Sequence, residues 1–212
     1  MRYERKYRIE DLSIDAVKQM VRHHPAVFEE IYPIRKINNI YFDTPGLTTY
    51  KDNVMGIANR KKIRVRWYGY LTERIIDPKL EIKMRFNEVG VKQTYSVADF
   101  ELDDLTSLTK EVNLLANETS LSPILINSYH RSYWGTKDKK YRLTIDWQMA
   151  FTSIYDKVQF TANEMFDRDT VILELKYDRE LELEADFIAQ FIPYRRTKNS
   201  KYVNGVQLCL GQ

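Results

Sequence analysis

The sequence predicts an α+β protein built around a large antiparallel sheet or barrel, and three observations predict it. Apolar and polar residues alternate with a period of two in eight segments, which is typical of strands with two chemically different faces. Three further segments carry apolar residues at helical spacing. No Ser/Gly-rich or Pro-rich linker divides the 212 residues, so we expect a single domain over 1–212.

The eight expected strands are spread along most of the chain. They are residues 2–9, 38–43, 62–68, 79–86, 91–97, 127–134, 142–147 and 171–177. The third strand shows the alternation best, because Lys62, Arg64 and Arg66 share one face and only apolar side chains share the other.

Helices are expected at 15–23, 103–117 and 179–192. Ser13 is a candidate N-cap for the first helix, and Glu184 interrupts the apolar stripe of the last one. A sheet with one apolar face must bury that face, so we expect these helices to cover it.

Composition excludes several classes of protein. The single cysteine, Cys209, excludes an internal disulfide framework and a Cys-rich zinc site. No apolar region follows Met1 and no run approaches the roughly 20 apolar residues of a membrane span, so we expect a cytoplasmic protein without a signal peptide. The net charge of +3, from 33 Lys and Arg against 30 Asp and Glu, indicates no particular partner.

The polar strand faces have a much stronger bias toward positive charge than the whole chain. Their cations are Arg2, Lys6, Arg8, Lys62, Arg64, Arg66, Lys83, Arg85, Arg131, Arg142 and Lys176, and their carboxylates are Glu4, Glu81, Asp146 and Glu174. A half-buried sheet with a solvated polar face is the ordinary explanation of such alternation. A surface selected for solubility mixes both signs, however, and like charges about 6 Å apart repel by roughly 3 kcal/mol at an effective dielectric near 20. The bias therefore favours an anionic ligand, and Arg with Lys suits a polyphosphate.

The strand motifs resemble those of the vacuolar transporter chaperone (VTC) polyphosphate polymerase domain, a branch of the triphosphate tunnel metalloenzyme superfamily. The matching segments, in family order, are Tyr3-Glu4-Arg5-Lys6-Tyr7, Ile40-Tyr41-Phe42-Asp43-Thr44-Pro45, Lys62-Ile63-Arg64-Val65-Arg66-Trp67-Tyr68-Gly69, Leu80-Glu81-Ile82-Lys83, Tyr129-His130-Arg131-Ser132-Tyr133, Arg142-Leu143-Thr144-Ile145-Asp146, Leu173-Glu174-Leu175-Lys176-Tyr177 and Ser200-Lys201-Tyr202. Each motif is weak alone, but eight in order cover nearly the whole chain.

The resemblance implies an eight-stranded antiparallel β-barrel, a triphosphate tunnel with flanking helices, whose inward residues hold phosphates. The implied phosphate-binding residues are Lys6, Arg64, Arg66, Lys83, Lys92, Tyr129, Arg131, Arg142, Lys176 and Lys201. Glu174 stands where the family holds a divalent metal, Mn²⁺ or Mg²⁺. Glu4 and Glu81 are weaker metal candidates, because the alternative is that they orient neighbouring cations.

The implied activity is transfer of the ATP γ-phosphate to a polyphosphate chain. The residues expected to act on the transferred group are Arg64, Arg66, Lys83, Arg131, Arg142 and Glu174. Two alternatives use the same scaffold: a hydrolase of inorganic triphosphate or polyphosphate, and a non-catalytic polyphosphate-binding adaptor. ATP and polyphosphate are the expected partners. No nucleic acid is expected, and the lack of an intrinsic membrane segment leaves room for a membrane partner protein.

Overall fold

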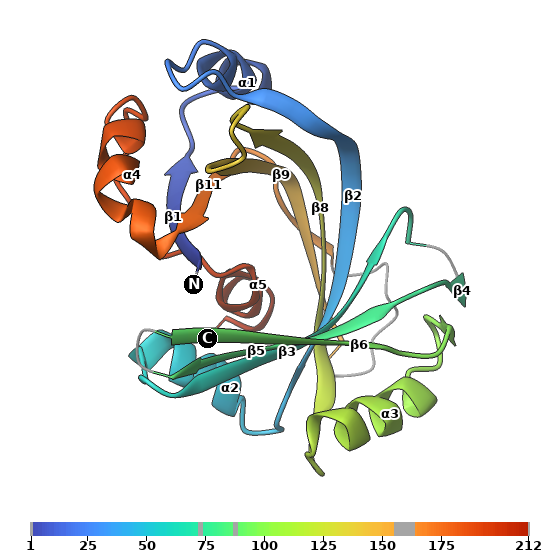
Figure 1. Ribbon diagram of the computed structural model, residues 1–212. Coiled ribbons are helices and arrows are strands. Elements are labelled where there is room, and N and C mark those ends of the chain that lie inside the picture. The colour runs from blue at the N-terminus through green and yellow to red at the C-terminus, as the bar shows by residue number, and fades with distance from the viewer. Residues whose placement is uncertain (1, 72–73, 87–88, 155–163, 212) are drawn as a thin grey trace. The chain divides into compact units, whose positions relative to one another are not determined.

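The computed structural model describes residues 2–71, 74–86, 89–154 and 164–211 (Figure 1). These residues form a nine-stranded sheet, a two-stranded sheet and five α-helices. The ladders that join β1 to β11, β11 to β9, β2 to β3, β3 to β5 and β5 to β6 are antiparallel. The predicted α+β class with a large antiparallel sheet is confirmed. None of the helices described has the length and hydropathy that a membrane span requires.

The elements follow one another along the chain. In order they are β1 (Arg2–Ile9), α1 (Ile14–Arg22), β2 (Glu29–Asp43), α2 (Thr48–Met55), β3 (Arg60–Tyr68), β4 (Arg74–Ile75), β5 (Lys79–Phe86), β6 (Val89–Ser96), β7 (Phe100–Glu101), α3 (Thr106–Ala116), β8 (Ser122–Gly135), β9 (Arg142–Ser153), β10 (Glu164–Asp167), β11 (Val171–Asp178), a 3₁₀ turn (Arg179–Leu181), α4 (Glu182–Ala189) and α5 (Lys201–Leu210).

The order of strands in the large sheet is β1-β11-β9-β8-β2-β3-β5-β6, with β10 paired to β9. Across the ranges that the structure describes, no ladder joins β1 to β6, the two ends of this path. The closed eight-stranded barrel implied by the resemblance is therefore not seen in the pairing of the described residues.

The chain packs as two compact units, which we describe separately. The first unit comprises Met1–Arg35, Tyr129–Met149 and Phe166–Asn199, and the second comprises Lys36–Ser128, Ala150–Met165 and Ser200–Gln212. Strands β2, β8 and β9 each contribute residues to both units.

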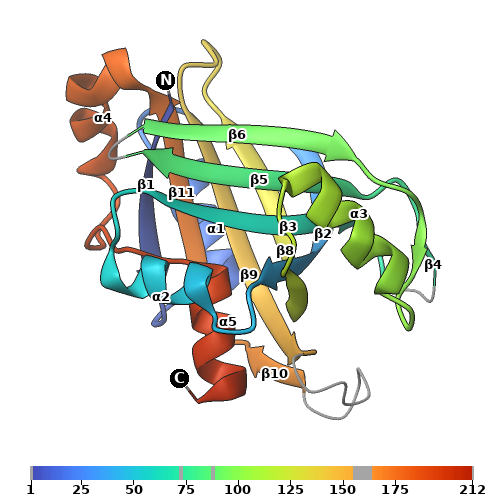
Figure 2. The same ribbon diagram turned by 90° about the horizontal axis from the view of Figure 1, so that it is seen from below.

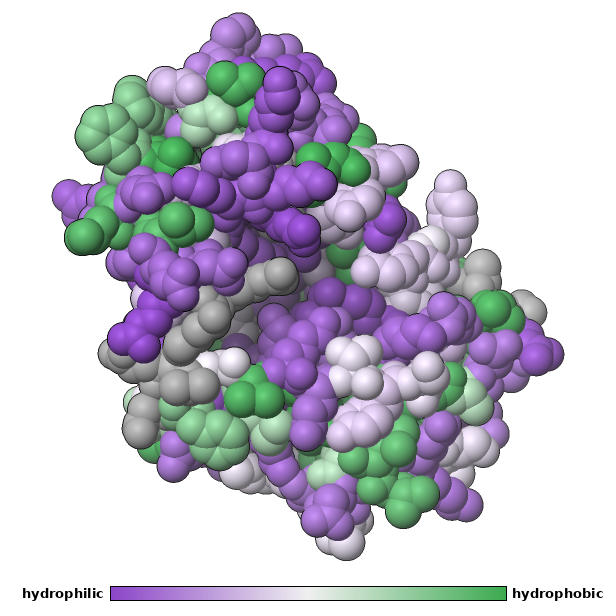
Figure 3. Space-filling model, in the orientation of Figure 1, coloured by the Kyte–Doolittle hydropathy of each residue, from purple (hydrophilic) through white to green (hydrophobic). Residues whose placement is uncertain are grey.

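In the first unit, α1 and α4 cover the apolar faces of β1, β9 and β11, as predicted. Val17 and Val21 of α1 and Ala185 of α4 are buried in one core with Ile145 and Leu173. Apolar side chains also gather on the surface in the region of α4, as Figure 3 shows. Phe187 of α4 is 74% exposed.

Arg5 is the exception on the apolar face of β1, and its contacts explain it. The side chain is 5% exposed and forms ion pairs with Glu182 at 2.8 Å and Asp186 at 2.6 Å. Its Nε donates to the Tyr177 hydroxyl at 2.6 Å. Burial opposes the charge of this guanidinium, but its hydrogen bond to Asp186 helps to raise the pKa of Arg5 above the usual value. A buried cation therefore fastens α4 to the sheet.

In the second unit, β3, β5 and β6 lie side by side in both ribbon views (Figures 1 and 2). Their apolar face buries Ile63, Val65 and Leu80 against Leu108 and Val112 of α3. The helix predicted at 103–117 thus covers this face as expected.

Helices α2 and α5, the short strands β4, β7 and β10, the first nine residues of β2 and the outer ends of β8 and β9 were not predicted. The first nine residues of β2 contain Pro33 and show no alternation of apolar and polar residues. Residues 29–34 are all exposed, so neither face of this stretch needs to be apolar. Helix α2 starts at Thr48 because Asp43, at the end of β2, accepts hydrogen bonds from the backbone N–H groups of Thr49 and Tyr50, each at 2.9 Å. Helix α5 packs closely, because a Cβ at Gly205 would collide with the side chains of Leu125 and Phe151.

Asp43 joins α2 and α5 to the sheet and offers a test of the fold. Its carboxylate is fully buried and also accepts from the Thr44 N–H at 2.7 Å and the Tyr202 hydroxyl at 2.6 Å. We expect Asp43→Ala to lower the free energy of unfolding by about 3 kcal/mol or more, because several buried donors lose their acceptor. Urea unfolding followed by circular dichroism measures the change.

Tyr202→Phe is the matched control, since it removes one of these hydrogen bonds and keeps the backbone ones. We expect it to cost about 1 kcal/mol. Equal losses for Asp43→Ala and Tyr202→Phe would contradict the capping role of Asp43.

Candidate functional site

The second unit carries a cation face on β3, β5 and β6. The pairing register places on one side of the sheet Arg60, Lys62, Arg64, Arg66, Lys79, Lys83, Arg85 and Lys92, with Glu81 as the only carboxylate from the described residues of these three strands. We call this set the cation face. The one-sided charge predicted for the strands is therefore found here in its strongest form.

Several of these cations stand directly opposite one another. Lys62 pairs with Lys83, which pairs in turn with Lys92, and Arg60 pairs with Arg85. Directly opposed like charges destabilise an antiparallel pair. Burial, and after it the charge of the opposed Arg85, lowers the pKa of the Arg60 guanidinium.

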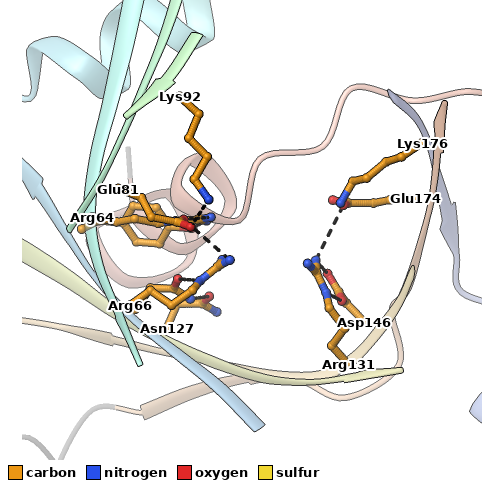
Figure 4. A network of polar contacts seen from close by, with 11 residues as sticks. Arg64, Arg66, Glu81, Lys92, Asn127, Arg131, Asp146, Glu174 and Lys176 are labelled. Atoms are coloured by element: carbon orange, nitrogen blue, oxygen red, sulfur yellow. Dashed lines mark hydrogen bonds and ion pairs between the residues drawn. The ribbon is translucent and has the colours of Figure 1, made fainter. Parts of the chain in front are cut away.

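The buried carboxylate of Glu81 forms ion pairs with three of these cations (Figure 4). Arg64 donates to Oε2 from Nη2 at 2.5 Å and from Nε at 2.8 Å, and Nη1 of Arg66 lies 3.6 Å from the same oxygen. Lys92 pairs with Oε1. Burial would raise the pKa of Glu81, but Arg64 and Arg66 hold it well below its usual range. These contacts match the alternative in which Glu81 orients its neighbouring cations.

Arg66 is also held by two buried amides that sequence analysis did not single out. Its Nε donates to Asn39 Oδ1 at 2.9 Å, and Asn39 Nδ2 donates to Asn127 Oδ1 at 3.3 Å. Asn127 Nδ2 donates to the Ala150 carbonyl at 3.1 Å. Both asparagines are fully buried. An asparagine in an alternating strand gives no sign of this role. Its place in the alternation shows which face of the sheet it occupies, but not whether its side chain holds an arginine or only packs in the core.

The remaining predicted cations of the second unit lie at different depths. Lys83 and Lys92 are exposed, whereas Lys201 is 9% exposed and begins α5. Lys62 donates to the hydroxyl of Ser200, the N-cap of α5, at 2.9 Å. Helix α5 therefore reaches the same side of the sheet as the cation face, where Tyr202 also stacks on Tyr41.

The first unit carries a second polar cluster around Glu174 of β11. Lys6 pairs with Glu174 across β1 and β11, with 3.6 Å between Nζ and Oε1, and Lys176 Nζ lies 2.9 Å from Oε2. Arg131 Nη2 lies 3.6 Å from Oε2, as Figure 4 shows. Lys6 also contacts Glu4 at 3.1 Å. We call these side chains the Glu174 cluster.

Arg131 is fixed by Asp146, so its position does not depend on Glu174 alone. Its Nε and Nη2 donate to the two carboxylate oxygens of Asp146 at 2.5 and 2.6 Å, and Asp146 is fully buried. Burial opposes the charge on Arg131, but Asp146 raises the pKa of this guanidinium well above its usual value. For Lys6, burial likewise opposes the charge, and Glu174 followed by Glu4 raises the pKa above its usual value.

The two sites differ in charge balance. The three carboxylates at the Glu174 cluster, Glu4, Asp146 and Glu174, face a similar number of cations, whereas Glu81 alone faces the cation face of the second unit. Tyr129 is buried, with the Arg131 guanidinium 5.4 Å from its ring centroid. Arg142 is exposed on β9 and lines a pocket with Arg131 and Lys176.

The side chains available for a metal are few. No group of three His, Cys, Asp or Glu residues within the described ranges is arranged to hold a metal ion. Glu174 and Glu4 both contact Lys6, so these two predicted metal candidates lie at one place, whereas Glu81 belongs to the second unit.

Comparisons with known proteins agree with this fold. The family model of the VTC domain matches residues 1–210, and no curated protein sequence matches the chain. A Vibrio parahaemolyticus protein provisionally described as an adenylate cyclase is 15% identical, with a TM-score of 0.55 over 96% of this chain and 97% of its own. A Pyrococcus horikoshii protein is 11% identical, with a TM-score of 0.53 over 95% of this chain and 93% of its own. A Bacillus halodurans protein with the same provisional description is 12% identical, with a TM-score of 0.51 over 94% and 96%. At these identities the likeness concerns the fold alone.

The crowded cations make Glu81 a test of the electrostatics of the site. We expect Glu81→Gln to lower the free energy of unfolding by about 3–5 kcal/mol, because Arg64, Arg66 and Lys92 lose their shared counterion. We further expect inorganic tripolyphosphate to raise the melting temperature of this variant more than that of the wild type. Differential scanning calorimetry with and without tripolyphosphate measures both effects.

Glu180→Gln is the matched control, because Glu180 is exposed in the first unit. We expect its free energy of unfolding, and the change in its melting temperature with tripolyphosphate, to equal those of the wild type. A Glu81→Gln protein as stable as this control would show that the ion pairs contribute nothing to stability.

The lowered pKa of Glu81 also predicts how stability depends on pH. A carboxyl whose pKa is lower in the folded than in the unfolded chain stabilises the fold above its unfolded value, near 4.5, and that contribution is lost as the pH falls toward the folded value. The difference in unfolding free energy between the wild type and Glu81→Gln should therefore be constant near neutral pH and shrink below about pH 4.5. Urea titrations between pH 3 and 7 test this, and a difference that grows on acidification would contradict the assignment.

Proposed function

The chain belongs to the VTC domain family, and from this premise we propose that it is a polyphosphate polymerase. In the proposed reaction, the γ-phosphate of ATP is transferred to the end of a polyphosphate chain. A divalent cation, Mn²⁺ or Mg²⁺, takes part, and residues 1–212 work as one domain.

The observation that carries the proposal is the cation face of the second unit. Eight lysines and arginines share one side of three strands with a single glutamate, and several of them are directly opposed. Without a ligand, this crowding works against a fold whose whole stability is on the order of 5–15 kcal/mol. A linear polyanion with one or more charges on each phosphate relieves the repulsion along the whole row.

The reaction asks the protein chiefly to position phosphates and to neutralise charge. An oxygen of the terminal phosphate of the growing chain forms the new bond to the γ-phosphorus. The bond from that phosphorus to the β–γ bridging oxygen breaks, and the oxygen leaves with ADP. The attacking phosphate is already ionised, so no strong general base is needed. In this proposal Arg64, Arg66, Lys83, Arg131 and Arg142 bind the transferred group and its neighbours, and Lys6, Lys92, Tyr129, Lys176 and Lys201 bind the rest of the phosphates.

Glu174, with Glu4 beside it, would hold the divalent cation. Mg²⁺ in phosphoryl-transfer sites is usually bound by one or two carboxylates together with substrate phosphates, so two carboxylates at the same ammonium fit a cation that arrives with ATP. When bound, the cation neutralises charge on the phosphate oxygens. The enclosed tunnel of the family is part of the proposal too, since it would keep the phosphates away from water.

Product analysis separates this activity from its two alternatives. With ATP, MnCl₂ and a short polyphosphate primer, we expect long polyphosphate on a gel, and we expect EDTA to abolish it. Release of orthophosphate from tripolyphosphate without polymer would favour the hydrolase. Binding of polyphosphate with neither product would favour the adaptor.

Glu174→Gln tests the assignment of the cation site. We expect the initial rate of polymer formation to fall by about 100-fold, the scale on which removal of one transition-state electrostatic partner acts. Glu180→Gln, the same substitution at an exposed position, should keep the wild-type rate. An undiminished rate in Glu174→Gln would show that Glu174 does not hold the cation.

A further inference from the structure

A pocket in the first unit combines two chemistries that the proposed function has not used together. It has a volume of about 290 Å³, near the lower end of small-molecule sites, and lies among β2, β8, β9 and β11. One part is cationic, with Arg131, Arg142 and Lys176 in its lining. Another part is aromatic, with Tyr32 and Tyr133.

The cationic part contains a buried group without a partner. Thr144, directly opposite Glu174 in the β9–β11 ladder, also lines the pocket. Its side chain is 6% exposed, and its hydroxyl has no hydrogen-bond partner within the described part of the chain. Buried hydroxyls are normally paired, so an unpaired one beside three cations indicates a place for an acceptor oxygen supplied from outside the protein.

The rings of the aromatic part contact one another in a defined arrangement and are still partly exposed to solvent. The rings of Tyr32 and Tyr133 meet edge to face, with 5.7 Å between centroids and an interplanar angle of 88°. The guanidinium of Arg35 lies 5.3 Å from the centroid of Tyr32 and 5.5 Å from that of Tyr133. Tyr32 is nevertheless 48% exposed. Aromatic rings that are held in place, partly exposed to solvent and next to an arginine are a usual platform for a nucleobase.

We propose that this pocket binds a nucleoside triphosphate by both ends. The base stacks on the Tyr32–Tyr133 platform beside Arg35, and the phosphates lie among Arg131, Arg142, Lys176 and the Thr144 hydroxyl. This inference rests on the proposed function and deepens it, because it assigns the nucleotide donor to the first unit. Stacking tolerates every base, so ATP and GTP should bind with similar affinity.

The proposal predicts a separation between the affinities for ATP and for inorganic tripolyphosphate. Isothermal titration calorimetry on the full chain with MgCl₂ gives both dissociation constants. Stacking on one aromatic side chain corresponds to about 5- to 150-fold in affinity, so Tyr32→Ala should weaken ATP binding within that range. Its affinity for tripolyphosphate should stay within about twofold of the wild type, since that ligand has no base.

Two further variants make the result decisive. Tyr32→Phe retains the ring and should retain the affinity for ATP. Tyr70→Ala removes a tyrosine that is 79% exposed in the second unit, outside the lining of this pocket, and should change neither constant.

Each contrary result has a distinct meaning. If Tyr32→Ala leaves the ATP constant unchanged, or weakens ATP and tripolyphosphate alike, the nucleobase platform is wrong while the phosphate site of the proposed function stands. If the wild-type protein binds neither ligand, the proposed function and the platform both fail.

Discussion

Repulsion among cations on one sheet face is the constraint on which the rest of the second unit depends. Side chains alternate across a strand, so the residues that give β3 and β5 their apolar core positions also fix Lys62, Arg64, Lys83 and Arg85 on the other side. Glu81 offsets part of the repulsion by binding Arg64, Arg66 and Lys92. The lysine row beside it has no carboxylate in its ladder positions. A polyanion bound as proposed would complete the electrostatics of the face.

In the first unit, carboxylates of the protein neutralise the cations. Its cations are paired with carboxylates on neighbouring strands, as Lys6 is with Glu174 and Arg131 is with Asp146. Paired charges of this kind bind a polyanion less strongly, because each phosphate must compete with a carboxylate already in place. They hold their partners in defined positions, however. A balanced cluster suits a site where one particular ligand is oriented, and an unbalanced face suits a polymer that need only be retained.

Much of the fold and part of the site follow from the sequence. Alternation predicted most of the strands and their charged faces, because the face that a strand residue occupies depends only on local spacing. Helical spacing predicted α1, α3 and α4. Helix α2 escaped prediction because its cap, Asp43, belongs to the end of β2. Helix α5 has a local cap in Ser200 and was missed all the same, and its Tyr202 hydroxyl is held by Asp43, which is distant in sequence. Asn39, Asn127 and Thr144 were not predicted as site residues. The alternation shows only which face of a strand a neutral polar residue occupies, and not which groups it contacts.

The exposed start of β2 shows how a gap in the alternation can conceal a candidate binding segment. Residues 29–34 lack alternation because both sides of this stretch are exposed, so the pattern that identifies a half-buried strand is absent. The same exposure leaves Tyr32 about half accessible to solvent, at 48%, while Tyr133 and Arg35 contact its ring. A binding platform needs both properties, a fixed geometry and an uncovered surface. Local departure from the pattern of a buried strand is therefore what a ligand-binding segment of this sheet should show.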